Sequence, residues 1–487
     1  MVPTVRSFSA DFEPLRLVAR FPEKYPGLLE SSAPIGTQVT GGGRFDILPI
    51  GSGECLRLGG DGELSGPHAA GADGFLSALE AWWKALRLPS AAAPLPFTGG
   101  WLLYLGYELA AEIEPRLALP PSPDSVIALA IRTPAAWIRD RATLQAWLVA
   151  EPEFEALLDT FENHVREVCV HGTPAGSRPA ASSFEIQEED PARFLEAVSR
   201  SLEYIAAGDV YQTNLSRQWQ VSSDQPLDPV SIYARLRTTN PSPFAAMMRY
   251  ENFSLMSSSP ERLLAIRGGI VSTRPIAGTR PRGTSPETDA ALVESLLSNE
   301  KERAEHVMLI DLERNDLGRV CVGGTVRVDE YMVLETYAHV HHIVSNLSGR
   351  LRDDVSPVQV IRALFPGGTI TGCPKMRCME IIAELEGTGR GAYTGSMGYL
   401  NRDGSGDLNI LIRTLTADAV ARPSSAARPM GRPSAGRGTD GRRSAASDAP
   451  IRFRAGAGIV ADSSPWQELA ETRAKALGLL RALDADS

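Results

Sequence analysis

The sequence predicts an α+β fold, with helices and antiparallel hairpins in a chain long enough for two domains. The chain has 487 residues, enough for two domains or for one large domain with a smaller partner. Several stretches place apolar residues at three- and four-residue spacing, which is typical of amphipathic helices. Other apolar runs are joined by glycine-bearing turns such as "YTGSMGY" and "AGAGIVADS", and such turns fit antiparallel hairpins.

We expect residues 1–170 to form an N-terminal domain and residues 186–487 a catalytic region. The polar stretch "HGTPAGSRPAASS" marks a linker between them, at 171–185. Residues 420–449 contain six arginines and almost no large apolar side chains, between the strand-like runs "DLNILIRTLTA" and "PIRFRAGAGIV". Such a segment cannot bury enough surface to offset its ordering entropy, so we predict a disordered insertion in a hairpin loop.

Composition and charge favour a cytoplasmic protein. The net charge of −10 disfavours a nucleic-acid or anionic-membrane partner, and no apolar run reaches the ~18–20 residues that cross a bilayer. The first residues, "MVPTVRSFSADFEPLRL", carry early acids and no continuous apolar core, so we expect no secretory signal. Five cysteines spread along a long chain argue against a disulfide framework.

The elements follow in chain order. "GGGRFDILPI" predicts a turn that leads into a strand, and "DGFLSALEAWWKALRL" an amphipathic helix. "DPARFLEAVSRSLEYIAAGDVYQTNLSRQWQV" predicts a capped helix, a Gly-Asp turn and a strand. Residues 287–319 predict one long helix, and residues 466–483 predict the last helix.

The last two helices carry candidate metal ligands. Glu468, Glu471 and Lys475 share one helical face, while Glu305 lies with Glu302 and His306 on the other helix. Carboxylates from two distant helices suit Mg²⁺, which prefers hard oxygen ligands. A solvated salt-bridge face explains the C-terminal set equally simply, and spacing alone leaves both interpretations open.

"YAHVHHIVSNL" places three histidines within four residues. No cysteine or acid accompanies them at zinc-site spacing, so one histidine acting as a general acid is the better hypothesis. Glycine-rich turns let backbone N–H groups approach a small anion, and Arg413 and Lys475 could bind its carboxylates. These residues therefore suggest a site for a small multi-anionic substrate.

Taken together, "RPIAGTRPRG", "KERAEHVMLIDLERNDLGRV", "HHIVSNLSG", "FPGGTITGCPKMRCMEII", "YTGSMGYL", "GAGIVADS" and "ELAETRAKA" resemble the chorismate-utilising enzymes. The resemblance covers Asp190 to the C-terminus except for the arginine-rich insertion. It implies the two-domain, anthranilate synthase component I-like fold of that family, with large antiparallel sheets, flanking helices and a deep cleft. "LLES" and "NPSPF" resemble elements of a tryptophan pocket in this family. A family member that binds an aromatic metabolite without catalysis is a distant alternative.

The resemblance also implies roles for individual residues. Glu305, Glu468 and Glu471 match the carboxylates that hold Mg²⁺, and His342 matches the histidine that assists departure of the C4 hydroxyl. Ala277, Thr279 and Gln212 occupy other catalytic positions. The positions that contact chorismate correspond to Gly278, Thr369, Tyr393, Arg413, Gly456, Ala457, Gly458 and Lys475.

Gln212 indicates the nucleophile. Relatives that add water carry lysine at the matching position as a base, and a neutral amide cannot deprotonate water. The expected nucleophile is therefore ammonia. Since no cysteine of the chain sits in a sequence like a glutaminase nucleophile, the resemblance implies a separate glutamine amidotransferase subunit as the ammonia source.

Ala277 bears on the product. Anthranilate synthases typically read "PIAGT", as this chain does, whereas aminodeoxychorismate synthases typically read "PIKGT" and use the lysine as a nucleophile. Elsewhere "VYQTNLSR", "SSSPERLL", "FPGGTITGCPK" and "YTGSMGYL" look more like the aminodeoxychorismate branch. We therefore expect formation of 4-amino-4-deoxychorismate for para-aminobenzoate and folate synthesis, without the usual lysine. Formation of anthranilate for tryptophan synthesis is the alternative.

Overall fold

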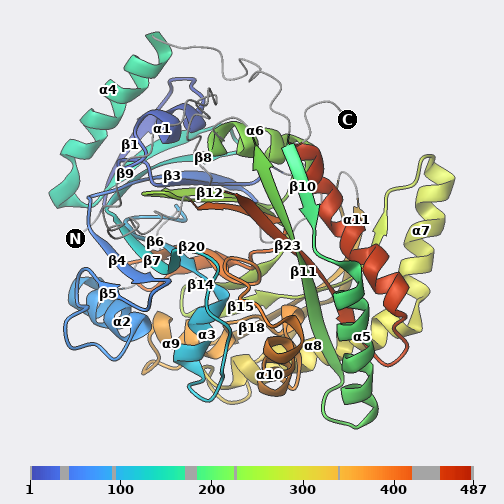
Figure 1. Cartoon of the computed structure of the whole chain (residues 1–487). Coiled ribbons are helices and arrows are strands. Elements are labelled where there is room, and N and C mark those ends of the chain that lie inside the picture. The colour runs from blue at the N-terminus through green and yellow to red at the C-terminus, as the bar shows by residue number, and fades with distance from the viewer. Residues whose placement is uncertain are drawn as a thin grey trace, which may run out of the picture.

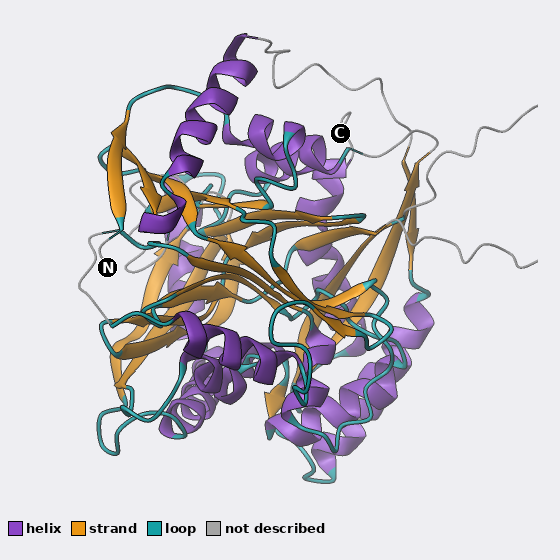
Figure 2. Cartoon of the chain, turned by 90° about the vertical axis from the view of Figure 1, so that its left-hand side faces the viewer, coloured by secondary structure: helices purple, strands orange, loops and turns teal. Residues whose placement is uncertain are grey.

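The computed structural model of the chain describes residues 3–32, 43–89, 95–170, 184–223, 228–337, 340–418 and 450–483. In this part of the chain two large antiparallel sheets lie against one another, and helices cover the outer side of each (Figure 1). Figure 2 shows the same order of layers from the side, with the strands between two groups of helices.

The first sheet has twelve strands among the described residues. One of the twelve, the short strand β19 (Gly372–Cys373), pairs with β11 beside the main path. Along the sheet the order is β1 (Thr4–Phe8), β9 (Ala146–Ala150), β8 (Ala135–Asp140), β3 (Phe45–Ile50), β2 (Gly27–Glu30), β12 (Phe244–Tyr250), β13 (Phe253–Ser259), β22 (Thr414–Asp418), β23 (Ile451–Ile459), β11 (Gln212–Ser223) and β10 (Phe184–Glu188).

The second sheet has eleven described strands. Here β17 (Arg327–Thr336) pairs with β18 beside the main path. The order is β16 (Ile276–Pro281), β18 (Val340–Arg350), β15 (Ile270–Arg274), β14 (Arg262–Arg267), β21 (Gly406–Asn409), β20 (Ser396–Asn401), β6 (Gly100–Leu105), β7 (Val126–Thr133), β4 (Cys55–Gly59) and β5 (Leu64–Ser65).

The helices pack on both sheets. The α-helices are α1 (Pro14–Arg20), α2 (Phe75–Leu86), α3 (Ala110–Ile113), α4 (Ala156–Val170), α5 (Pro191–Ala206), α6 (Pro229–Thr239), α7 (Pro286–Ser298), α8 (Glu300–Gly318), α9 (Pro357–Leu364), α10 (Lys375–Glu386) and α11 (Pro465–Leu483). Three short 3₁₀ helices join them: η1 (Tyr107–Leu109), η2 (Pro152–Phe154) and η3 (Gly368–Ile370).

Apolar clusters hold these layers together. One joins α1, α4, α6 and α11 to the first sheet, and another joins α2, α8 and α9 to the second. Between the sheets, Leu102 and Leu129 of the second sheet pack with Met248 and Leu255 of the first. Because each sheet is apolar on both sides, its strands are buried between a layer of helices and the other sheet.

The predicted helices around the site are present, with one correction. The helices expected in "DGFLSALEAWWKALRL" and after Asp190 are α2 and α5, and the Asp190 side chain caps α5 by accepting from the Ala192 N–H. Residues 287–319 form two helices, because Asn299 leaves the helical region at φ −71°, ψ 106°. Its side chain accepts the Glu302 N–H and so caps α8.

The run "DLNILIRTLTA" is not one strand, and this is a second correction. It divides into β21, in the second sheet, and β22, in the first. Between them Arg413 adopts φ +52°, which turns the chain from one sheet to the other. The predicted insertion at 420–449 lies outside the described residues, as does the part of the predicted linker at 171–183.

Residues 1–170 do not form a sheet of their own. The first sheet combines β1, β2, β3, β8 and β9 from this region with strands that follow residue 184. In the second sheet β6 pairs with β20 over Gly100–Leu105 and Ser396–Asn401. No helix among the described residues is long and apolar enough to cross a membrane.

Candidate active site

Strands β11 and β23 form one wall of the candidate site. Asn214 pairs with Gly458, and Ser216 pairs with Gly456. A Cβ atom on Gly458 would lie 2.5 Å from Nε2 of Gln212, and one on Gly456 would lie 2.5 Å from the Tyr393 hydroxyl. Glycine at these two positions therefore leaves room for side chains that reach across the strand from β11 and from the loop before β20.

Two helices bring carboxylates to this wall. From α8, Glu305 accepts a hydrogen bond of 2.9 Å from Nε2 of Gln212. From α11, the Lys475 ammonium donates to the Gly456 carbonyl at 3.0 Å and lies 2.7 Å from a carboxylate oxygen of Glu471. Glu305, the expected metal ligand of α8, and Lys475 of α11 thus lie beside the same short segment, Gly456–Gly458.

The chemistry of the predicted ligands suits Mg²⁺, because all three are carboxylates and Mg²⁺ prefers oxygen ligands. Glu305 and Glu468 are partly buried, whereas Glu471 is exposed. Within the described residues no three histidine, cysteine, aspartate or glutamate side chains are gathered closely enough to hold a metal ion. Binding as predicted would require the three carboxylates to come closer together, with Glu471 leaving its ion pair with Lys475.

The second wall of the candidate site is the pair β16 and β18, against which helix α8 packs. A bulge at Gly278, with φ +71°, separates the pairs Ala277–Ile343 and Thr279–His342. Ala277 is 8% exposed and its methyl group offers no nucleophile. A Cβ on Gly278 would lie 2.7 Å from Oε2 of Glu302, so the bulge needs glycine both for its φ and for space.

His342 is buried beside this bulge. Its Nδ1 lies 2.9 Å from Oγ1 of Thr279, and its Nε2 has no partner among the described residues. Burial, helped by the nearby Arg413 guanidinium, lowers the pKa of His342 to about 3. The imidazole is therefore neutral at physiological pH and can donate from only one nitrogen at a time.

Arg413 is a buried cation that is not paired with a carboxylate among the described residues. Its guanidinium makes no hydrogen bond or ion pair within the part of the chain that the structure describes. Burial lowers the pKa of Arg413 from its ordinary value, with Tyr337 and Glu261 nearby opposing the shift. A desolvated arginine that lacks a carboxylate partner is suited to an anionic ligand.

Two residues that sequence reasoning missed belong to this site. Glu261 is 4% exposed, accepts from the Ile276 N–H at 3.4 Å and lies next to Thr369 of η3. Burial raises the pKa of Glu261 to about 7. The other is Asn214, whose Oδ1 is buried without a partner. The first follows a proline in "SSSPE" and the second alternates with Gln212, but neither pattern identifies a site by itself.

Buried polar atoms on both walls lack partners. Oε1 of Gln212, Oδ1 of Asn214 and Nε2 of His342 lack hydrogen-bond partners among the described residues. Most buried polar atoms in folded proteins are paired, because an unpaired one costs about 1–3 kcal/mol. Together with Arg413, they indicate a space prepared for a polar ligand.

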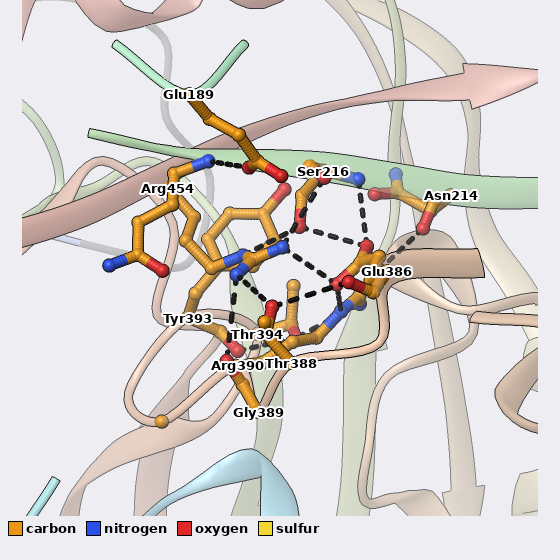
Figure 3. Close-up of polar contacts among 12 residues, drawn as sticks. Glu189, Asn214, Ser216, Glu386, Thr388, Gly389, Arg390, Tyr393, Thr394 and Arg454 are labelled. Atoms are coloured by element: carbon orange, nitrogen blue, oxygen red, sulfur yellow. Dashed lines mark hydrogen bonds and ion pairs between the residues drawn. The ribbon is translucent and has the colours of Figure 1, made fainter. Parts of the chain in front are cut away.

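A buried ion-pair network supports the wall from behind. Glu386 of α10 accepts hydrogen bonds from Arg390, Arg454 and the N–H and hydroxyl of Ser216 (Figure 3). Arg390 lies 5.5 Å from the centre of the Tyr393 ring. The network therefore fixes β11, β23 and the loop that carries Tyr393 relative to one another.

The N-terminal region completes this support. The Glu108 carboxylate accepts from the N–H groups of Arg390 and Gly391, and the Arg390 guanidinium also stacks at 4.9 Å over the Tyr107 ring. Away from the site, "LLES" and "NPSPF" meet at a separate pocket of about 300 Å³, lined among others by Glu30 and Phe244.

Comparisons with known proteins identify the family of the chain. Residues 64–424 match the family described as chorismate binding enzyme. The chain is 40% identical over 397 residues to the anthranilate synthase component I-like protein of Synechocystis sp., covering 80% of this chain and 74% of that protein. It is 39% identical to aminodeoxychorismate synthase component 1 of Bacillus subtilis, covering 84% of this chain and 82% of that protein.

A solved structure confirms the expected fold. The crystal structure of anthranilate synthase component I from Streptococcus pneumoniae matches with a TM-score of 0.75 at 27% identity, covering 96% of this chain and 98% of that one. The predicted α+β architecture with large antiparallel sheets and flanking helices is therefore correct.

Proposed function

The chain belongs to the family of chorismate-binding enzymes, and we propose that it aminates chorismate with ammonia as the nucleophile. The observation that carries the proposal is the position of Gln212. Its neutral amide lies at the wall of the site and is hydrogen-bonded to Glu305. An amide does not deprotonate water at neutral pH, whereas ammonia needs no base to attack.

Substrate binding is assigned to the cationic and glycine-rich parts of the site. Arg413 and Lys475 bind the carboxylates of chorismate, while Gly278, Gly456, Ala457 and Gly458 let it approach the backbone. Tyr393 and Thr369 contact its ring or side chain. When Mg²⁺ is held by Glu305, Glu468 and Glu471, it supplies positive charge that neutralises the ring carboxylate.

His342 assists departure of the C4 hydroxyl group. If the Thr279 hydroxyl donates to Nδ1, the proton of the neutral imidazole resides on Nε2, which then faces the site as a donor. Glu261 is a second proton donor on the same side. Its pKa of about 7 keeps a fraction of this carboxyl group protonated at neutral pH.

Of the two possible aminations, we propose the one that gives 4-amino-4-deoxychorismate for para-aminobenzoate and folate synthesis. The motifs "VYQTNLSR", "FPGGTITGCPK" and "YTGSMGYL" support this assignment. Since Ala277 replaces the lysine that resembling enzymes use, a small nucleophile takes the place of that lysine at C2. Ammonia itself is the simplest candidate.

Ala277 also favours the second candidate function, formation of anthranilate. With a methyl group at this position, direct attack of ammonia at C2 needs no covalent enzyme intermediate. In both cases ammonia comes from a separate glutamine amidotransferase, and the name "component 1" of the Bacillus relative supports a multi-subunit arrangement.

Product analysis distinguishes the two functions. Purified protein is incubated with chorismate, Mg²⁺ and ammonium chloride, with and without an aminodeoxychorismate lyase. Para-aminobenzoate that appears only with the lyase supports the first assignment. Anthranilate that appears without the lyase supports the second, and absence of any chorismate turnover contradicts both.

A further inference from the structure

We propose that the side-chain oxygens of Gln212 and Asn214 form a binding subsite for ammonia, an inference that rests on the amination proposed above. The two residues alternate on β11, so their side chains lie on the same face of the strand. Gln212 is 2% exposed and Asn214 is 8% exposed. Both amide oxygens lack hydrogen-bond partners among the described residues.

The orientation of the Gln212 amide is fixed by its neighbour. Its NH₂ group donates to the Glu305 carboxylate at 2.9 Å, and a carboxylate can only accept. The oxygen of the same amide must therefore point away from Glu305. A Cβ atom at position 458 would lie 2.5 Å from Nε2, so the close approach of Gly458 packs the amide from the side of β23.

Asn214 is held through its backbone. Its N–H donates to the Thr371 carbonyl at 3.0 Å, and its carbonyl accepts from Arg390 at 2.6 Å. The next residue on this face, Ser216, is bound to Glu386, as Figure 3 shows. Oδ1 of Asn214 lies 2.9 Å from the position that a Cβ of Gly456 would occupy, so this glycine leaves the oxygen open.

Two buried acceptors require a ligand that donates. The carboxylates of chorismate are acceptors only, and its C4 hydroxyl has a single O–H, so chorismate does not satisfy both oxygens. A water molecule would satisfy them but would not attack, because neither amide is a base. Ammonia has three N–H donors and one lone pair. Two N–H groups can therefore be bound by Gln212 and Asn214 while the lone pair remains free for attack.

The test measures KM for ammonium and KM for chorismate separately, because the proposal predicts a change in the first only. In Asn214→Leu the acceptor is replaced by an apolar side chain of similar size. We expect KM for ammonium chloride, measured at constant pH and saturating chorismate, to rise about tenfold, which is the loss of one hydrogen bond. KM for chorismate and the chorismate affinity measured by calorimetry should change less than about twofold.

Gln220→Leu on the exposed part of β11 is the matched control and should leave both constants unchanged. Asn214→Ser, which is smaller, replaces the leucine variant if the latter fails to fold. An unchanged KM for ammonium overturns the inference. So does a rise in KM for chorismate, or in the Mg²⁺ concentration for half-maximal rate, without a rise for ammonium. If the wild-type protein does not consume chorismate with ammonium, the proposed amination itself is wrong.

Discussion

Nδ1 of His342 lies 2.9 Å from the hydroxyl oxygen of Thr279, across the bulge that Gly278 introduces between β16 and β18. This contact ties the candidate catalytic histidine to the strand that carries Ala277. Because His342 is neutral, its one ring proton resides on Nε2 when the Thr279 hydroxyl donates to Nδ1.

Thr279→Val removes that hydroxyl at constant shape. We expect kcat to fall about ten- to a hundredfold, because Nε2 loses part of its proton occupancy, while KM for chorismate changes little. Steady-state kinetics at saturating ammonium measure both constants. Thr160→Val, at a partly exposed position of α4, is the control. A matching rise in KM with unchanged kcat would mean that Thr279 binds substrate instead.

The raised pKa of Glu261 should make the stability difference between the wild type and Glu261→Gln depend on pH. Its pKa is raised from 4.5 to about 7, so the folded protein holds this proton where the unfolded chain has released it. The stabilisation is present below about pH 4.5 and is lost as the pH rises through about 7. The free energy of unfolding of Glu261→Gln, relative to that of the wild type, should therefore rise by up to about 3 kcal/mol between about pH 5 and pH 8.

Urea denaturation at the two pH values measures this difference. Glu153→Gln, at an exposed position, controls for the general effect of removing a carboxylate. A difference in free energy of unfolding that is the same at both pH values would contradict the raised pKa of Glu261.

Ala277→Lys should create a covalent intermediate. The position is buried beside the bulge of Gly278, and its strand neighbour Thr279 contacts His342. A lysine amine there is placed to attack chorismate at C2 with loss of the C4 hydroxyl group. We expect the intact protein mass to increase by that of chorismate less water when ammonium is withheld. An unaltered mass, with chorismate binding retained, counts against this geometry.

Metal removal tests the carboxylates. Chelation with EDTA should abolish turnover, and Glu305→Gln should weaken Mg²⁺ binding at least about tenfold, because one anionic oxygen ligand is lost. Calorimetric titration with Mg²⁺ measures the affinity directly. Glu196→Gln, exposed on α5, should bind Mg²⁺ as the wild type does. Equal affinities of the two variants would remove Glu305 from the metal site.

Glu386→Gln tests the network behind the wall. Arg390 and Arg454 would lose their shared buried anion, so we expect a loss of about 3–5 kcal/mol in the free energy of unfolding. Chemical denaturation measures this loss. Glu384→Gln, exposed on the same helix, should cost less than about 1 kcal/mol. Similar losses for both variants would show that helix α10, rather than the ion pairs, limits stability.

The sequence alone predicted several local elements correctly. The apolar spacing of "FLSALEAWWKAL" specifies α2, and Asp190 with Pro191 specifies the start of α5. It did not reveal the break at Asn299 or the change of sheet at Arg413. The break and the change of sheet depend on where the adjoining segments pack. Neither asparagine nor arginine has a backbone preference strong enough to predict them from the sequence.

The motifs of the sequence determined the family, and they named the residue types that we expect at the candidate site: carboxylates, a histidine, an arginine, a lysine and glycines. Only the tertiary structure decided which atoms meet, because Gln212 and Glu305 are 93 residues apart and a hydrogen bond of 2.9 Å requires α8 to lie against β11. The same reason applies to Glu261 and Asn214. Their significance is burial beside the site, and burial is a property of the packed sheets rather than of the local sequence.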